Sequence, residues 1–254
     1  MFIDTHVHLN DLTLYAKLEE VVKESKDNKV NKWIVVSYDL ASSKRAIEIA
    51  EKLENCYCAI GFHPTDIRGY DEEYTWLEEN INHPKVVAVG EIGFDFYHDR
   101  TTKEEQYEAF VRQIRIAKKY NKPVVIHSRD ALELTYKVLK EEHIESVGGV
   151  MHSYSGSSEF APNFIKLNML LGISGPVTFK NGIKMKEVVK EIPLEYLLSE
   201  TDSPYLTPHP YRGKRNEPKY VALTFEKLCE IKNISKEEAM LQLEKNYQKM
   251  FKNH

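Results

Sequence analysis

The sequence predicts a single (β/α)8 TIM barrel that occupies residues 1–254. Its length is common for this fold. Eight short β-rich runs alternate with segments of helical spacing, and most runs are continuously apolar, which is typical of strands buried on both faces of a parallel sheet. A doubly wound open sheet is the competing fold, but no Gly-x-Gly-x-x-Gly motif follows any run and eight units favour closure of the sheet.

The predicted strands are, in chain order, FIDTH, WIVVS, YCAIG, VVAVGEIG, PVVIHS, VGGVMHS, MLLGIS and YLLSETD. The predicted helices cover residues 13–27, 42–54, 71–81, 101–120, 130–142, 157–167, 181–191 and 219–231, with one more near 235–250. Asp130 and Ser235 stand where their side chains can cap the first turn of a helix. No low-complexity linker or internal repeat divides the chain, so we expect one domain.

Composition excludes several classes of protein. No apolar run approaches the roughly 18 residues that a membrane span needs, and the first strand begins at Phe2 without a leader before it, so we expect a cytoplasmic protein with no membrane contact. The three cysteines lack Cys-x-x-Cys spacing and are expected to be free thiols. A net charge of −4 argues against a protein that coats nucleic acid by bulk electrostatics. We predict no obligate protein partner.

Six side chains that can bind metals fall at the ends of the predicted strands. The carboxyl ends of barrel strands form one face, so these residues converge although they span nearly the whole chain. Spacing of two places both imidazoles of the first strand on one face, and we expect Val87, Val89, Val125 and Val150 to share the inner side with the ligands that follow them. The six candidates are His6, His8, Glu91, His127, His152 and Asp202.

Each candidate alone has a structural interpretation, such as a hydrogen-bonded histidine or a helix-capping carboxylate. The set does not, because burying four imidazoles and two carboxylates together without a cation costs several kcal/mol. Six ligands suffice for two divalent ions with open positions. We place one ion on His6, His8 and Asp202 and the second on His127 and His152, and Glu91 bridges both.

The donor set suits Zn, Mn, Fe, Co or Ni better than Mg, and the identity of the metal stays open. Two divalent ions against two carboxylates leave the predicted site positive by two charges, which favours an anionic substrate.

The stretches IDTHVHLND, IGFHP, VGEIGFDFY, VIHSRDA, MHSYSGS and SETDSPYLTPHPYRGKRNEP resemble the TatD-type metal-dependent deoxyribonucleases, a branch of the amidohydrolase-like barrels. The resemblance runs from the first strand to the eighth and implies that the six candidates bind metal. Family members are generally described as magnesium-dependent nucleases, and the resemblance suggests attack from a 3′ end. One stretch departs from the family pattern, Phe94–Tyr97, where we expect leucine and a tyrosine pair.

The substrate contacts are predicted from position. The segment from Pro208 to Pro218 follows the eighth strand and forms a basic patch, whose arginines can take phosphate oxygens; a solvated charged loop is the alternative. His63 ends the third strand, Arg129 follows the ligand of the fifth and Tyr154 follows that of the sixth, so we expect all three at the same end of the barrel as the metal ligands. Aromatics here can stack on a base or pack in the core. The predicted contacts are His63, Arg129, Tyr154, Arg212 and Arg215.

Our leading hypothesis is metal-dependent hydrolysis of a DNA phosphodiester, at a strand end or in an unpaired segment and not in an intact duplex. The resemblance favours an exonuclease that acts from a single-stranded 3′ end. Asp202 would accept the proton of the attacking water, with Glu91 as the second catalytic carboxylate. An amidohydrolase or esterase with another substrate, including an aminoacyl ester on tRNA, is the alternative. A protein that binds metal or nucleic-acid ends without catalysis is the second rival, and it predicts DNA binding without cleavage.

Overall fold

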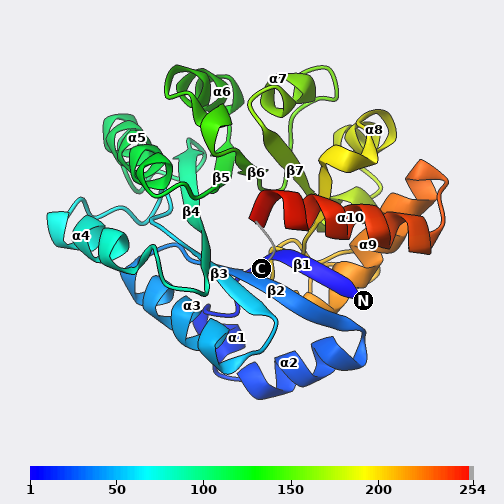
Figure 1. Ribbon diagram of the computed structural model, residues 1–254. Coiled ribbons are helices and arrows are strands. Elements are labelled where there is room, and N and C mark those ends of the chain that lie inside the picture. Colours follow the sequence, from blue (N-terminus) through cyan, green and yellow to red (C-terminus); the bar gives the residue numbers. More distant parts are fainter. Residues whose placement is uncertain (252–254) are drawn as a thin grey trace.

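The computed structural model describes residues 1–251, and these form the predicted barrel (Figure 1). Eight parallel strands follow one another in chain order around the sheet. The last strand meets the first, because Val7 and Ser203 form a parallel bridge and the amide of His8 donates to the carbonyl of Ser203 over 2.8 Å. The strands are β1 (Phe2–Val7), β2 (Val30–Val36), β3 (Cys56–Ile60), β4 (Val86–Asp95), β5 (Val124–Arg129), β6 (Gly149–Met151), β7 (Met169–Ile173) and β8 (Leu197–Ser199).

Helices surround the strands and follow most of the predicted segments (Figure 1). The predicted helix 13–27 is wrong as a single element, because it is interrupted at Ala16 and Lys17. The predicted helix 157–167 is also too long, since only five residues are helical there. The helices are α1 (Leu12–Tyr15), α2 (Leu18–Asp27), α3 (Leu40–Lys52), α4 (Asp71–Asn80), α5 (Lys103–Lys119), α6 (Leu132–Glu141), α7 (Ala161–Ile165), α8 (Ile183–Glu191), α9 (Val221–Lys232) and α10 (Lys236–Phe251).

The two predicted caps have different outcomes. Ser235 caps α10, because its hydroxyl accepts the amide hydrogen of Glu238 over 3.1 Å. Asp130 does not cap α6: that helix begins at Leu132 without a side-chain cap, and Asp130 has a left-handed backbone with φ 54°. The turn after β5 therefore uses Asp130 to reverse the chain before the helix starts.

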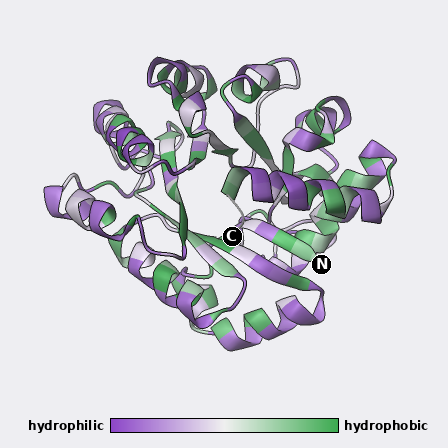
Figure 2. Ribbon diagram, viewed as in Figure 1, coloured by the Kyte–Doolittle hydropathy of each residue, from purple (hydrophilic) through white to green (hydrophobic). Residues whose placement is uncertain are grey.

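The inside of the barrel is a small apolar cluster to which every strand contributes. Tyr247, Met250 and Phe251 of α10 complete this cluster, and α10 lies across the barrel in the view of Figure 1. A larger cluster fills the layer between strands and helices, where the helices turn apolar residues inward, and Figure 2 shows both hydrophobic and hydrophilic residues on each of them. Fully burying one aliphatic side chain contributes about 1.5–3 kcal/mol, so this packing fixes the strand ends that carry the site.

Three of the four valines that were expected inside the barrel lie there. Val87, Val125 and Val150 belong to the inner cluster. Val89 belongs to the outer cluster, and the prediction for it is wrong. The strict alternation of β4 is broken by a register shift against β5 between Val89 and Ile92, so the spacing of two fails just before Glu91.

Within the described residues, none of the helices combines the length with the apolar character that a membrane crossing demands.

Candidate metal centre

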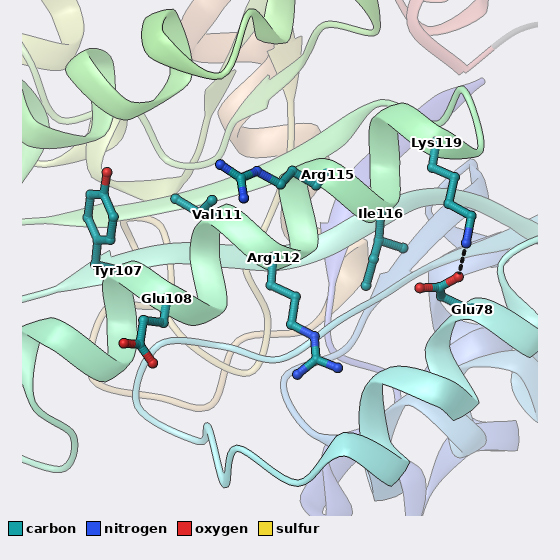
Figure 3. Close-up of a pocket in the computed structure, with 8 residues that line it drawn as sticks. All are labelled: Glu78, Tyr107, Glu108, Val111, Arg112, Arg115, Ile116 and Lys119. Carbon is teal, nitrogen blue, oxygen red and sulfur yellow. Dashed lines mark hydrogen bonds and ion pairs between the residues drawn. The ribbon is translucent and has the colours of Figure 1, made fainter.

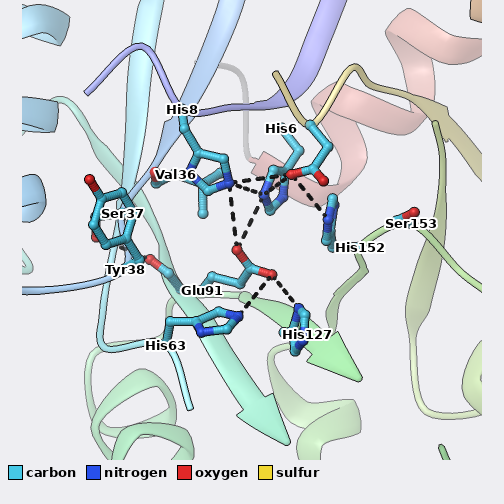
Figure 4. Close-up of polar contacts among 12 residues, drawn as sticks. His6, His8, Val36, Ser37, Tyr38, His63, Glu91, His127, His152 and Ser153 are labelled. Atoms are coloured by element: carbon cyan, nitrogen blue, oxygen red, sulfur yellow. Dashed lines mark hydrogen bonds and ion pairs between the residues drawn. The ribbon is translucent and has the colours of Figure 1, made fainter. Parts of the chain in front are cut away.

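The six predicted ligands converge at the carboxyl ends of the strands. Figure 4 labels five of them, His6, His8, Glu91, His127 and His152. Five of the six are buried, and the side chain of His127 is 19% exposed. They come from β1, β4 and β5, from the residues directly after β1 and β6, and from the turn after β8. We call these six residues the metal centre: His6, His8, Glu91, His127, His152 and Asp202.

Glu91 stands between two groups of histidines. Its Oε2 lies 3.4 Å from Nε2 of His6 and 3.8 Å from Nε2 of His8. Its Oε1 lies 2.9 Å from Nδ1 of His127 and 4.0 Å from Nε2 of His63. The two oxygens of one carboxylate therefore face different imidazoles, which is the arrangement that a bridging ligand needs (Figure 4).

Asp202 gathers the remaining imidazoles around one oxygen. Its Oδ1 lies 3.3 Å from Nε2 of His8, 3.4 Å from Nε2 of His152 and 3.7 Å from Nε2 of His6. The residue has a left-handed backbone with φ 59°, and its amide donates to the carbonyl of His6 over 2.9 Å. Both features tie the turn after β8 to the end of β1.

Two imidazoles of the metal centre form a hydrogen bond through the ring nitrogen that faces away from the centre. Nδ1 of His8 donates to the carbonyl oxygen of Val36 over 2.8 Å, and Nε2 of His127 donates to Oδ2 of Asp95 over 3.0 Å. With a metal bound, these bonds would keep the proton on the outer nitrogen and leave the lone pair of the inner one to the ion. Nε2 atoms of His6 and His8 nevertheless lie 3.2 Å apart.

These inner nitrogens face one another and the two carboxylates, an arrangement that a bound cation would stabilise. The donor set of imidazole nitrogens and carboxylate oxygens fits a divalent transition ion. The residues present therefore fit the metal that the sequence predicts.

The pKa values of these groups are set by burial on one side and by their charged neighbours on the other. Burial opposes a charge on His127, but its bonds to Asp95 and Glu91 outweigh burial and raise its pKa to about 9. Burial likewise opposes ionisation of Glu91 and Asp202, yet the surrounding histidines hold the pKa of both carboxyls well below the usual range. The folded chain thus keeps its carboxylates ionised and favours positive charge between them.

Sequence reasoning missed three buried acids beside the metal centre. Asp95 contacts His127, Glu200 contacts His152, and Asp4 accepts the hydroxyl and amide of Thr201. Their spacing offered a signal for two of them: Asp4 lies two residues before His6, and Glu200 lies two residues before Asp202.

These acids change the predicted charge of the site. Burial raises the pKa of Asp4 to about 8, so that acid is largely neutral at pH 7. Asp95 and Glu200 add two carboxylates beside the two that were counted from the sequence. The predicted excess of two positive charges is therefore wrong, and attraction for an anion must come from the side chains at the rim.

The distances also refine how the six residues divide between two ions. Ligand atoms of His6, His8 and Asp202 lie within 3.7 Å of one another, close enough to share one ion. The ring of His152 stacks on that of His6 with centroids 3.5 Å apart, so His152 also borders this group. His127 lies on the other side of Glu91, beside His63 and Asp95.

Three of the five predicted substrate contacts lie on the side of the barrel where the metal centre opens. The ring of His63 lies 4.3 Å from that of His127, at the edge of Glu91. The guanidinium of Arg129 lies 4.1 Å above the ring of Tyr97, which is 61% exposed. Arg212 stacks in the same way on Phe179, at 4.3 Å.

The other two predicted contacts have structural partners. Tyr154 is buried, packs against Phe164 and donates its hydroxyl hydrogen to the carbonyl of Ser157, so the structure contradicts a stacking role for this ring. Arg215 is exposed but bonds Glu217 and the carbonyl of Thr13 over 3.2 Å each. Its guanidinium is already engaged by the chain.

A separate groove of about 520 Å³ lies on the outer surface between α4 and α5 (Figure 3). Cations line it, but each has an acidic partner: Lys119 contacts Glu78 at 2.5 Å and Arg115 contacts Glu142 at 2.8 Å. The groove is built by the outer faces of helices, away from the strand ends that form the metal centre.

Comparison with known proteins identifies the family of this chain. The family model described as TatD related DNase matches residues 3–252. YabD of Bacillus subtilis strain 168, an uncharacterized metal-dependent hydrolase, is 47% identical over 253 residues and covers 99% of each chain. YcfH of Escherichia coli K12, with the same description, is 33% identical and covers 98% of this chain and 95% of its own.

A solved structure extends the agreement to the fold. The crystal structure of YJJV, a TatD homolog from Escherichia coli K12, matches with a TM-score of 0.94 at 31% identity, and the match covers 99% of this chain and 98% of that one. The family model, the relatives and the solved structure each span nearly the whole chain. The chain belongs to the TatD-related DNase family of metal-dependent hydrolases.

Proposed function

We propose that this protein is a deoxyribonuclease that hydrolyses phosphodiester bonds from a single-stranded 3′ end of DNA. The observation that carries the proposal is the position of Glu91, whose two oxygens face different histidine groups. Such a carboxylate suits a binuclear site, and binuclear sites recur in enzymes that displace oxygen at phosphorus. The family match supports DNA as the substrate.

Two divalent ions would be held by the six residues of the metal centre. One ion is assigned to His6, His8 and Asp202, whose ligand atoms lie within 3.7 Å of one another, and the other to His127 and His152, with Glu91 shared. Zn, Mn, Mg, Fe, Co and Ni are the candidates. When bound, such ions make water more acidic and neutralise charge that develops on phosphoryl oxygens.

Asp202 is the proposed proton acceptor. Its backbone amide donates a hydrogen bond to the carbonyl of His6, which holds it beside the metal centre. Its pKa lies well below the usual range because the neighbouring histidines outweigh burial. An ionised carboxylate in this position can orient an attacking water and take its proton. Glu91 holds the histidine groups on either side and is the second carboxylate of the proposed reaction.

Rim side chains supply the proposed contacts to the substrate. Arg129 and Arg212 present guanidinium groups that can take phosphate oxygens, and each rests on an aromatic ring that can also stack with a base. His63 lies at the edge of Glu91, where it can reach a substrate phosphate. These two pairs of an arginine and an aromatic ring can bind a phosphate and stack on an exposed base, which suits an unpaired strand end better than an intact duplex.

The direct test is cleavage of single-stranded oligonucleotides labelled at the 5′ or the 3′ end. The protein is first stripped with a chelator and then supplied with Mg, Mn or Zn. We expect metal-restored, stepwise shortening of the 5′-labelled strand, and immediate release of a labelled nucleotide from the 3′-labelled one. A blocked 3′ end serves as the control and should stop the reaction.

Two results would redirect the proposal. Metal binding without cleavage of DNA, together with hydrolysis of small esters, amides or an aminoacyl ester on tRNA, would move the assignment to those substrates. DNA binding without cleavage under any metal would favour a binding protein. We expect the protein in the cytoplasm, which fractionation of cells would check.

A further inference from the structure

We propose that Asp95 and Glu200 are positioning residues that hold the rings of His127 and His152 and thereby set the affinity of the second ion. The inference rests on the proposed binuclear site but not on its substrate. Both carboxylates are buried, and both contact the ring nitrogen that faces away from the metal centre.

Asp95 holds His127 from the end of β4. Its Oδ2 accepts a hydrogen bond from Nε2 of His127 over 3.0 Å, while Nδ1 of the same ring faces Glu91 at 2.9 Å. The carboxylate is itself fixed, since its Oδ1 accepts the backbone amides of Tyr97 and His98 over 3.0 and 2.9 Å. Asp95 therefore cannot rotate without breaking the turn that follows β4.

Glu200 holds His152 from the end of β8. Its Oε1 lies 2.8 Å from Nδ1 of His152 and accepts the amide of Ser153 over 2.7 Å. The contact between Nδ1 of His152 and Oε1 of Glu200 is short but does not have the angles of a hydrogen bond. Among the described residues, Nδ1 of His152 and Oε2 of Glu200 have no hydrogen-bond partner. Once a metal ion takes Nε2 of His152, the ring would be neutral and its remaining proton, on Nδ1, would point to Glu200.

The path of Glu200 across the sheet is unusual. Strand β7 lies between β6 and β8, so the carboxylate must pass over β7 to reach His152. It does so at Gly172, where a Cβ would lie 2.3 Å from Oε2 of Glu200. A glycine at this point is therefore required by the position of the carboxylate.

A carboxylate behind an imidazole has a defined effect on the metal site. It fixes which nitrogen carries the proton, aims the lone pair of the other nitrogen and raises the basicity of the ring. Removing such a partner typically weakens metal binding by about 10- to 100-fold. The proposed division of ligands gives His127 and His152 to the second ion. The loss caused by removing Asp95 or Glu200 should therefore fall on that ion.

The test is calorimetric titration of the metal-stripped full chain with Mn²⁺, which needs no substrate. We expect two ions for the unaltered chain, and in Asp95→Asn or Glu200→Gln an unchanged first ion with a second ion bound about 10- to 100-fold more weakly. Glu73→Gln is the matched control, since Glu73 is a buried carboxylate on α4. It should bind both ions as the unaltered chain does.

Several outcomes would overturn the inference. Unchanged affinity for both ions in both variants would remove the proposed role. Three ions in the unaltered chain and two in Asp95→Asn would make Asp95 a ligand, because His63, Asp95 and His127 also lie close enough to share an ion. Failure of cleavage in the oligonucleotide assay would refute the proposed substrate but leave the titration unaffected.

A spectroscopic measurement covers the case in which a variant does not fold. Long-range ¹H–¹⁵N spectra of the Zn-loaded, histidine-labelled unaltered chain report the tautomer of each ring. We expect the proton on Nε2 of His127 and on Nδ1 of His152, next to the two carboxylates. The opposite tautomer at either ring would overturn the inference for that ring.

Discussion

Gly172 and Glu200 are matched across two strands: a Cβ on Gly172 would lie 2.3 Å from Oε2 of Glu200. The φ of Gly172 lies outside the left-handed region, so its backbone is open to alanine and space alone decides the cost. A small residue on β7 is thus coupled to an acidic residue that directly follows β8 and contacts the metal centre.

The first prediction is that Gly172→Ala destabilises the protein by about 1–3 kcal/mol, as overpacking of a buried site does. The displaced Glu200 should also weaken binding of the second ion. Chemical denaturation measures the first effect and Mn²⁺ titration the second. The control is a double-mutant cycle with Glu200→Ala: the alanine at 172 should cost less once the carboxylate is gone, and additive costs would contradict the coupling.

The second prediction concerns metal removal. Chelation should lower the melting temperature, and adding metal back at about 100 times its dissociation constant should restore about 2.7 kcal/mol of stability per site. Calorimetry measures the shift. His83→Ala, on the surface beside Glu51, should respond as the unaltered chain does, whereas His8→Ala should lose much of the gain. An equal gain in His8→Ala would count against its role as a ligand.

The sequence predicts most of the fold because the strands appear in it as apolar runs. It also predicts that the six proposed ligands converge, because strand ends in a closed barrel must meet. The prediction fails where strand register or tertiary contacts determine the direction of a side chain. Val89 faces outward since β4 shifts register before Glu91. The predicted helix 157–167 overlooked Pro162, which favours the first turn of a helix, and α7 begins at Ala161.

Asp95 and Glu200, the two acids that contact His127 and His152, were harder to predict. Asp95 lies four residues after Glu91, and nothing in a strand pattern indicates that the two carboxylates contact the same imidazole. The ring of Tyr154 was placed at the site from its position after His152, yet it packs against Phe164. Direction of a side chain in a loop depends on the turn, which sequence spacing does not specify.

The third prediction is that Asp202→Asn lowers turnover on the oligonucleotide by about 10²- to 10⁴-fold, the range for loss of a general base. The amide keeps an oxygen for the ion, so we expect at least one metal to remain by elemental analysis. Steady-state cleavage rates and metal content are measured on the same preparation. Full activity in this variant would remove Asp202 from its assigned role.

The fourth prediction concerns pH. Burial raises the pKa of Asp4 from 3.8 to about 8, so the folded chain keeps a proton that the unfolded chain releases between these values. Stability from this group is present below pH 3.8 and is lost as the pH rises toward 8, with a slope of at most about 1.4 kcal/mol per pH unit. Denaturation of the metal-stripped chain from pH 5 to 8 measures the fall, and Asp4→Asn should show a shallower one. Parallel curves for the two proteins would refute the prediction.

The fifth prediction separates rim contacts from general surface charge. Arg129→Ala should raise KM for the oligonucleotide about tenfold with little change in kcat, because a charge-assisted hydrogen bond to phosphate contributes about 1.5–3 kcal/mol and this one is partly exposed to solvent. Its loss should also reduce the salt dependence of binding by about one ion.

Arg115→Ala is the matched control for this prediction, since Arg115 lies in the groove on α5 and pairs with Glu142 at 2.8 Å (Figure 3). It removes the same charge from the protein at a distance from the strand ends. Because long-range steering depends on total charge whereas a phosphate contact depends on position, only Arg129→Ala should change KM. Equal changes in the two variants would show that Arg129 acts through net charge and does not contact the strand.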